Sequence, residues 1–214
     1  MIQAKICGIN SQDAMHASIV GGAAFVGLVF YPPSPRAVTP SEAAQLVSGI
    51  PDHITKVGLF VDMDDDMLSA IVTQVPLDLL QLHGKESPAR LLEIKQLTGM
   101  PVMKAVRVAT VQDIADADAY LDVADHILFD GKAPPTMKGA LPGGNAVTFD
   151  WTLLAGRTWS RPWMLSGGLH AGNVAEAVAT SGAQSVDVSS GVESSPGTKD
   201  PARINDFLTT VRAL

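Results

Sequence analysis

Eight short apolar runs recur along this chain, and each is followed by a stretch with helical character. Most of these runs are apolar at consecutive positions, which is typical of parallel strands that are buried on both faces. The predicted strands are Ala4–Ile9, Phe25–Phe30, Ile54–Val61, Leu77–Leu82, Pro101–Val108, His126–Asp130, Trp163–Ser166 and Ser185–Ser189. The predicted helices lie near residues 12–20, 40–49, 65–74, 87–97, 111–119, 149–155, 171–180 and 201–213.

Eight strand–helix units in a chain of 214 residues leave little choice of fold. Units of about 27 residues suit a closed (β/α)8 barrel. The alternative is an open, doubly wound sheet, but the sequence carries no signal for the reversal of strand order that such a sheet needs. We therefore predict an α/β fold, a single-domain (β/α)8 TIM barrel with a parallel eight-stranded sheet over residues 1–214.

Two local signals refine this outline. Thr39 and Glu42 form a capping box with Pro40 at the first helical position, and either Asn10 or Ser11 can cap the first helix. The longest irregular stretch is Gly131–Val147. Loops of this length in compact domains are usually functional, so we expect this one to reach the site.

Charge and cysteine content limit the possible partners. The net charge is −7, which offers no broad attraction for nucleic acid or for an anionic membrane surface. The single cysteine, Cys7, excludes an internal disulfide and fits a reducing compartment. No signal peptide and no apolar run of about 18 residues is found, so we expect a cytoplasmic protein without a membrane span.

In a barrel of this type the active site lies at the carboxyl ends of the strands. Cys7 ends the first predicted strand and Asp130 ends the sixth. Cys7 could be a small buried hydrophobe or a functional thiol, and Asp130 could be a solvated loop cap or a functional acid. Lys5 shares the side of the strand that carries Cys7. We expect it to pair with an acid such as Asp187, and it could also favour the thiolate.

Two further side chains follow strand ends. Arg36 lies in a loop that the prolines of 32–35 stiffen, which suits bidentate binding of a carboxylate. His83 could be a general base, a ligand or a hydrogen-bonded wall of the pocket, and the last interpretation is favoured. The other histidines show no metal-ligand spacing, so we predict no metal site.

Glycine-rich segments follow the seventh and eighth predicted strands, at the recurrent phosphate site of this fold. The candidate phosphate-binding residues are Gly167, Gly168, Ser189, Ser190 and Gly191. In a closed barrel these segments lie between Asp130 and Cys7, with Arg36 beyond Cys7. A ligand with phosphate at one end and carboxylate at the other would place its middle between the acid and the thiol.

At these residues the sequence resembles the phosphoribosylanthranilate isomerase family. The matching segments, in chain order, are KICGIN at 5–10, GLVFYPPSPR at 27–36, GLFVD at 58–62, QLHG at 81–84, LFDG at 128–131, FDWTLL at 149–154, LSGGLHAGNV at 165–174 and DVSSGVESSPGTKD at 187–200. Two positions depart from the family pattern: Asn10 stands where threonine is common, and Ala146 takes a glycine position.

The resemblance implies an Amadori rearrangement of N-(5'-phosphoribosyl)anthranilate to 1-(2-carboxyphenylamino)-1-deoxyribulose 5-phosphate, in tryptophan biosynthesis. It implies Asp130 as general acid and Cys7 as general base, with Arg36 on the anthranilate carboxylate. Backbone groups of Gly168 and Gly191, with Ser190, would hold the phosphate. No cofactor is implied. We expect a small phosphorylated substrate and a monomer or homodimer.

Three alternatives remain at this point. An indole-3-glycerol-phosphate synthase would need catalytic Lys and Glu residues at strand ends. A ribulose-phosphate epimerase would need metal-ligating His and Asp residues. Neither set is clear here. A barrel that only binds a phosphorylated metabolite is disfavoured because both Cys7 and Asp130 are present.

Overall fold

The computed structural model describes all 214 residues, Met1–Leu214, and forms a closed barrel of eight parallel strands in chain order. The strands are β1 (Gln3–Cys7), β2 (Phe25–Val29), β3 (Thr55–Phe60), β4 (Leu79–Leu82), β5 (Val102–Val108), β6 (His126–Gly131), β7 (Trp163–Leu165) and β8 (Ser185–Val188). The barrel closes where β8 pairs with β1, with Asp187 opposite Lys5. The prediction of a closed barrel is confirmed, and the doubly wound alternative is wrong.

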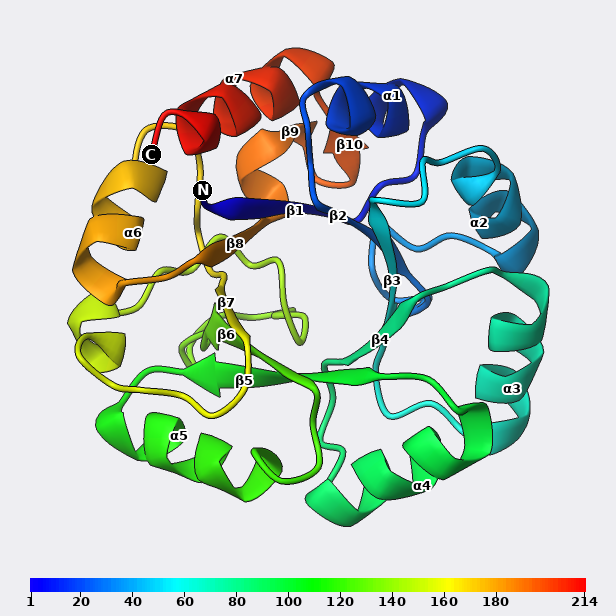
Figure 1. Cartoon of the computed structure of the whole chain (residues 1–214), viewed down its shortest axis with the longest axis horizontal. Helices are drawn as coiled ribbons and strands as arrows, with labels where there is room; N and C mark the ends of the chain where they lie inside the picture. Colours follow the sequence, from blue (N-terminus) through cyan, green and yellow to red (C-terminus); the bar gives the residue numbers. More distant parts are fainter.

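Seven α-helices surround the barrel, as Figure 1 shows. They are α1 (Gln12–Val20), α2 (Pro40–Val47), α3 (Asp65–Gln74), α4 (Pro88–Thr98), α5 (Val111–Asp116), α6 (Val174–Ser181) and α7 (Pro201–Arg212). Three 3-10 turns complete the chain: η1 (Ala117–Tyr120), η2 (Trp151–Leu154) and η3 (Ser190–Val192). None of the helices is both long and apolar enough to cross a membrane.

The predicted helix at 149–155 is wrong, because only the short turn η2 forms there. Asp150 caps that turn by accepting from the Thr152 N–H, and Gly156 follows with φ +69°. A left-handed glycine so soon after the cap ends the segment before an α-helix can form. In Figure 1 this turn fills the gap in the outer ring between α5 and α6. The helix predicted at 111–119 is also divided, into α5 and η1.

The helix starts follow the capping chemistry of the sequence. Thr39 and Glu42 form the predicted capping box at α2, and Ser11 rather than Asn10 caps α1 by accepting from the Ala14 N–H. The Asn10 side chain instead donates to the Gly197 carbonyl at 2.9 Å. Gly197 lies in an antiparallel hairpin that was not predicted, β9 (Glu193–Ser195) with β10 (Thr198–Lys199).

Strand register decides which side chains enter the barrel. A cluster of seven buried side chains fills the barrel interior below the carboxyl ends of the strands: Phe25, Val57, Leu79, Met103, Ala105, Leu128 and Met164. Lys5 pairs with Phe25 and therefore faces the same interior. Because side chains alternate along a strand, Cys7 faces the interior two residues further on, at the carboxyl end. The larger apolar core lies between the sheet and the helices.

Candidate active site

A cavity opens at the carboxyl ends of the strands, and about 660 Å³ of space lies within it and its opening to solvent. Its polar lining comes from five strand ends and two loops: Cys7, Ser34, Arg36, Gln81, His83, Asp130, Asn145, Ser166, Asp187, Ser189 and Ser190, with Gly143, Gly144, Gly167 and Gly168. Of the predicted site residues, only Gly191 is outside this lining.

The Cys7 thiol lies beside a buried cation. Lys5 donates to Asp187 at 2.8 Å, which confirms the predicted pair, and the other Asp187 oxygen accepts from Ser166 at 2.9 Å. A Cβ on Gly27 would lie 3.0 Å from the Cys7 Sγ and 3.2 Å from the Lys5 Nζ. The sulfur and the ammonium group therefore lie close together, both next to Gly27. Burial raises the pKa of Cys7 and the charge of Lys5 opposes that rise.

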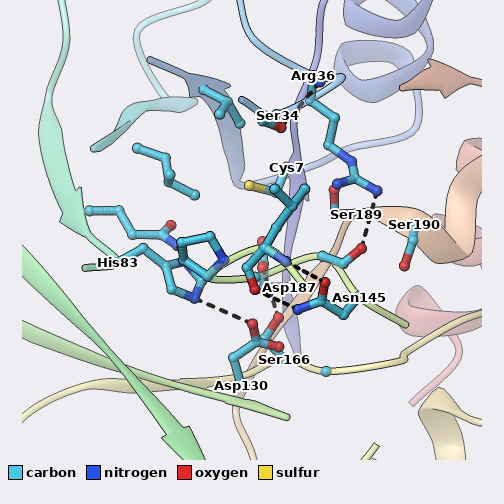
Figure 2. Close-up of a pocket in the computed structure, with 18 of the residues that line it drawn as sticks. Cys7, Ser34, Arg36, His83, Asp130, Asn145, Ser166, Asp187, Ser189 and Ser190 are labelled. Carbon is cyan, nitrogen blue, oxygen red and sulfur yellow. Dashed lines mark hydrogen bonds and ion pairs between the residues drawn. The ribbon is translucent and has the colours of Figure 1, made fainter. Parts of the chain in front are cut away.

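Asp130 lies at the carboxyl end of β6, one residue before its last, on the other side of the glycine loops. Its Oδ1 accepts from the Gly131 N–H at 2.9 Å, and its Oδ2 is 3.3 Å from the His83 Nε2. In Figure 2 the thiol of Cys7 and the carboxyl of Asp130 are well separated, with Asp130 beside His83. Both groups thus line one cavity from strands β1 and β6, which the order of the closed barrel separates by β7 and β8.

His83 is a wall of this cavity, as favoured from the sequence. Its Nδ1 is 3.1 Å from the Nε2 of Gln81, a fully buried side chain that the sequence analysis missed. The approach of its Nε2 to Asp130 falls short of hydrogen-bond alignment, and Nε2 has no hydrogen-bond partner. Catalytic hydrogen bonds are often loose without substrate and tighten when it binds.

Arg36 is buried and already holds a carboxylate of the protein. Its Nε and Nη2 donate to the two oxygens of Glu193 at 2.7 and 2.9 Å, and Nη2 also reaches the Gly144 carbonyl at 3.3 Å. Burial would raise the pKa of Glu193, but Arg36 and Lys199 outweigh it and hold that pKa low. The Nη1 of Arg36 makes no hydrogen bond and lies against Gly144. Glu193 was not among the predicted site residues, although it stands in the segment at 187–200 that matches the family.

The glycines after β7 leave two backbone donors free at the cavity. Gly167 and Gly168 have φ values of +94° and +61°, and no hydrogen bond within the protein uses their N–H groups. Successive N–H groups in such a conformation can form an anion-binding nest. Gly191 has a different reason to be glycine, because a Cβ there would lie 1.9 Å from the Leu169 carbonyl oxygen.

The long loop after β6 reaches into the cavity, as expected. Asn145 accepts from the Leu141 N–H at 2.9 Å and donates to the Leu141 carbonyl at 2.7 Å, so its side chain closes the segment 141–145 on itself. Ala146, the residue at a glycine position of the family, has φ +56°. An L-residue with a Cβ in this region costs about 1–2 kcal/mol.

We expect Ala146→Gly to relieve this strain. The gain is about 1 kcal/mol in the free energy of unfolding, less the extra entropy of glycine in the unfolded chain. Thermal denaturation should show a melting temperature higher by up to about 2–4 °C. Ala140→Gly is the matched control, because Ala140 lies in the same loop without a positive φ. A lower melting temperature for Ala146→Gly than for wild type contradicts the strain.

The fold and the cavity define a (β/α)8-barrel enzyme with a thiol and a carboxyl group, from different strands, in one cavity. Within the chain, no three His, Cys, Asp or Glu side chains gather as a metal-ligand group. The sequence matches the family model described as N-(5'-phosphoribosyl)anthranilate (PRA) isomerase over residues 4–210.

Individual proteins agree with the family match. The N-(5'-phosphoribosyl)anthranilate isomerase of Rhodospirillum centenum is 57% identical over 213 residues, which cover 100% of this chain and 99% of that protein. The crystal structure of phosphoribosyl anthranilate isomerase from Thermotoga maritima superposes with a TM-score of 0.89 at 36% identity, with 100% of both chains covered. A crystal structure of a phosphoribosyl anthranilate isomerase in complex with reduced 1-(o-carboxyphenylamino)-1-deoxyribulose 5-phosphate has a TM-score of 0.86 at 33% identity, again over 100% of both chains. This chain belongs to the phosphoribosylanthranilate isomerase family.

Proposed function

We propose that this chain isomerises N-(5'-phosphoribosyl)anthranilate to 1-(2-carboxyphenylamino)-1-deoxyribulose 5-phosphate, with Asp130 as general acid and Cys7 as general base. The observation that carries this assignment is that both side chains line one cavity, from β1 and β6, with the glycine loops of β7 and β8 between them. The Amadori rearrangement needs a proton given to the ring oxygen and a proton taken from C2, two atoms that are both bonded to C1 of the pentose. Membership of the family supplies the reaction and its place in tryptophan biosynthesis.

Asp130 acts in the first step. Its carboxylic acid gives a proton to the furanose ring oxygen, the bond from C1 to that oxygen breaks, and the anilino nitrogen lone pair forms the C1=N bond of a protonated Schiff base. The carboxylate that remains keeps its hydrogen bond from the Gly131 N–H. Hydrogen bonds to a charged acceptor are stronger than those to a neutral one, so this contact favours the products of the step.

Cys7 acts in the second step. The thiolate removes the proton from C2, the C–H electron pair forms C1=C2, and the C1=N pair returns to nitrogen, which gives an enolamine. The enolamine becomes the ketone when C1 takes a proton and the C2 hydroxyl loses one. Burial disfavours the thiolate, whereas Lys5 favours it. A substrate cation at the Schiff base, formed only after ring opening, favours it further at the moment when a base is needed.

Arg36 is our candidate for the anthranilate carboxylate. Two of its nitrogens are taken by Glu193, but Nη1 is free and Nη2 bonds only weakly to the Gly144 carbonyl. A substrate carboxylate can therefore bind Nη1 and replace the carbonyl of Gly144 at Nη2. The phosphate would take the free N–H groups of Gly167 and Gly168 with Ser189 and Ser190.

Arg36→Met tests this orientation. It removes the cation but keeps much of the side-chain volume, and Glu193 keeps its bond from Lys199 at 2.6 Å. Loss of a charge-assisted bidentate contact costs about 1.5–3 kcal/mol per hydrogen bond, so the dissociation constant of the reduced product should rise at least about tenfold. Calorimetric titration with inorganic phosphate should change less. Equal losses for both ligands contradict the orientation.

The activity itself is tested by the fluorescence of the anthranilate substrate, which should disappear when purified protein is added and should not reappear. Binding of the substrate without its consumption would leave the non-catalytic alternative standing and refute the proposal. Parallel assays with a ribulose-phosphate epimerase substrate should show no turnover. We also propose that the protein is cytoplasmic. We propose that it is a monomer or a homodimer, two states that light scattering distinguishes by mass.

A further inference from the structure

The contact between Asp130 and His83 depends on which ring nitrogen of His83 carries hydrogen. The His83 Nε2 is 3.3 Å from the Asp130 Oδ2, and both side chains are buried. Once Asp130 is a carboxylate, a lone pair on Nε2 would set two acceptors against each other at that distance. A neutral His83 therefore fits the carboxylate state of Asp130 only with its hydrogen on Nε2, which leaves Nδ1 as an acceptor.

Gln81 is the side chain that meets Nδ1. It lies two residues earlier on β4, so both side chains point into the barrel, and its Nε2 is 3.1 Å from the His83 Nδ1. An amide N–H can donate there only when Nδ1 has a lone pair. The reverse amide orientation would present Oε1 and would require hydrogen on Nδ1. In this structure the amide contacts the ring through its Nε2, and its Oε1 has no hydrogen-bond partner.

The loop after β6 keeps solvent away from this pair. A Cβ on Gly143 would lie 2.5 Å from the His83 Cε1, 2.8 Å from its Nε2 and 2.9 Å from the Asp130 Oδ2. The backbone of Gly143 thus lies directly against both groups. The His83 Nε2 is itself buried, so the contacts of the ring with Asp130 and Gln81 favour one tautomer over the other.

We propose that Gln81 is a positioning residue that holds His83 in the tautomer whose Nε2–H faces Asp130. This rests on the proposed role of Asp130 as the general acid. When Asp130 gives up its proton, the Nε2–H faces a carboxylate instead of a carboxylic acid, and the 3.3 Å approach can tighten into a charge-assisted hydrogen bond. It therefore stabilises the state after proton transfer more than the state before it, which lowers the barrier. The opposite tautomer would set a lone pair against the new negative charge.

Gln81→Met removes the amide with little change in side-chain length. Nitrogen NMR of the free enzyme then shows which ring nitrogen of His83 carries hydrogen. Wild type should show hydrogen on Nε2 and a lone pair on Nδ1 of His83 at neutral pH. The variant should show a mixture of both tautomers. Hydrogen on Nδ1 in the wild type, or an unchanged tautomer in the variant, overturns the proposal.

Kinetics separate positioning from general support of the fold. In Gln81→Met, kcat should fall about tenfold, the effect of one lost hydrogen bond, with KM changed less than about twofold. In a His83→Leu background the same substitution should change kcat little, because Gln81 acts through His83. Gln45→Met, on the exposed face of α2, is the control that should match wild type. Equal losses in both backgrounds contradict the proposal.

Failure of this inference is distinct from failure of the proposed function. The tautomer is measured without substrate, and Asp130→Asn tests the acid independently. If Asp130→Asn kept full turnover, the assignment of the acid would fall and with it the catalytic effect of Gln81. If Asp130→Asn were inactive but the wild-type tautomer were reversed, only the role of Gln81 would fall.

Discussion

Cys7→Ala should remove most turnover while the protein still folds and binds the reduced product. Loss of a general base typically costs about 10²–10⁴-fold in rate, and no other side chain of the cavity is placed to replace this one at β1. The change is small in volume, and the buried pair of Lys5 with Asp187 remains intact. Stopped-flow fluorescence of substrate consumption measures the loss, and calorimetric titration with the reduced product measures binding.

The pH dependence of kcat/KM is a second test of the Cys7→Ala variant. A base must be unprotonated, so activity that depends on Cys7 is present above the pKa of the thiol and is lost as pH falls through it. Because burial raises that pKa, kcat/KM of the wild type should still rise with pH above neutrality. Cys7→Ala should lack this rise. Wild-type turnover in the variant, or an unchanged pH profile, contradicts the assignment of the base.

Asp130→Asn should be comparably damaging for the opposite step. The asparagine keeps the size of the side chain and can still accept from the Gly131 N–H, but it has no acidic proton for the ring oxygen. We expect turnover to fall about 10²–10⁴-fold, with binding of the reduced product changed only a few-fold. The reduced product is already open, so it does not need the acid. Steady-state fluorescence assays and calorimetry measure the two quantities.

Asp78→Asn is the matched control for this change. Asp78 precedes β4 at the opposite end of the barrel, where it accepts from the Lys56 N–H at 2.8 Å. The same substitution there should leave kcat and KM at wild-type values. Two results would refute the role of Asp130: full turnover in Asp130→Asn, or a loss that is matched by an equal loss of ligand binding.

The barrel was predictable because its strands are buried on both faces. In β2 all five residues are buried, so the segment appears in the sequence as a continuous apolar run. Cys7 and Asp130 could be predicted as site candidates for a related reason, since each is a polar or reactive residue at the carboxyl end of such a run. Once the barrel is closed, that position alone places them at its mouth. The pair of Lys5 with Asp187 follows from the same register.

Contacts between distant loops could not be predicted. Glu193 meets Arg36 across 157 residues, through a hairpin whose position depends on the closed barrel. The amide of Gln81 looks in the sequence like any polar residue of a strand, and only its distance to His83 gives it a role. The turn η2 forms in place of the predicted helix because Gly156, with its left-handed backbone, ends the segment early. The prediction followed the amphipathic pattern of the segment and gave this glycine too little weight.

A crystal structure with the reduced product bound tests most directly whether one substrate lies between the Cys7 thiol and the Asp130 carboxyl group. We predict the Cys7 Sγ within about 3–3.5 Å of the sugar C2, as productive geometry requires. The phosphate should meet Gly167 and Gly168, and the carboxylate should meet the Nη1 of Arg36. A ligand bound in the reverse direction, or held beyond reach of either Cys7 or Asp130, would contradict the account.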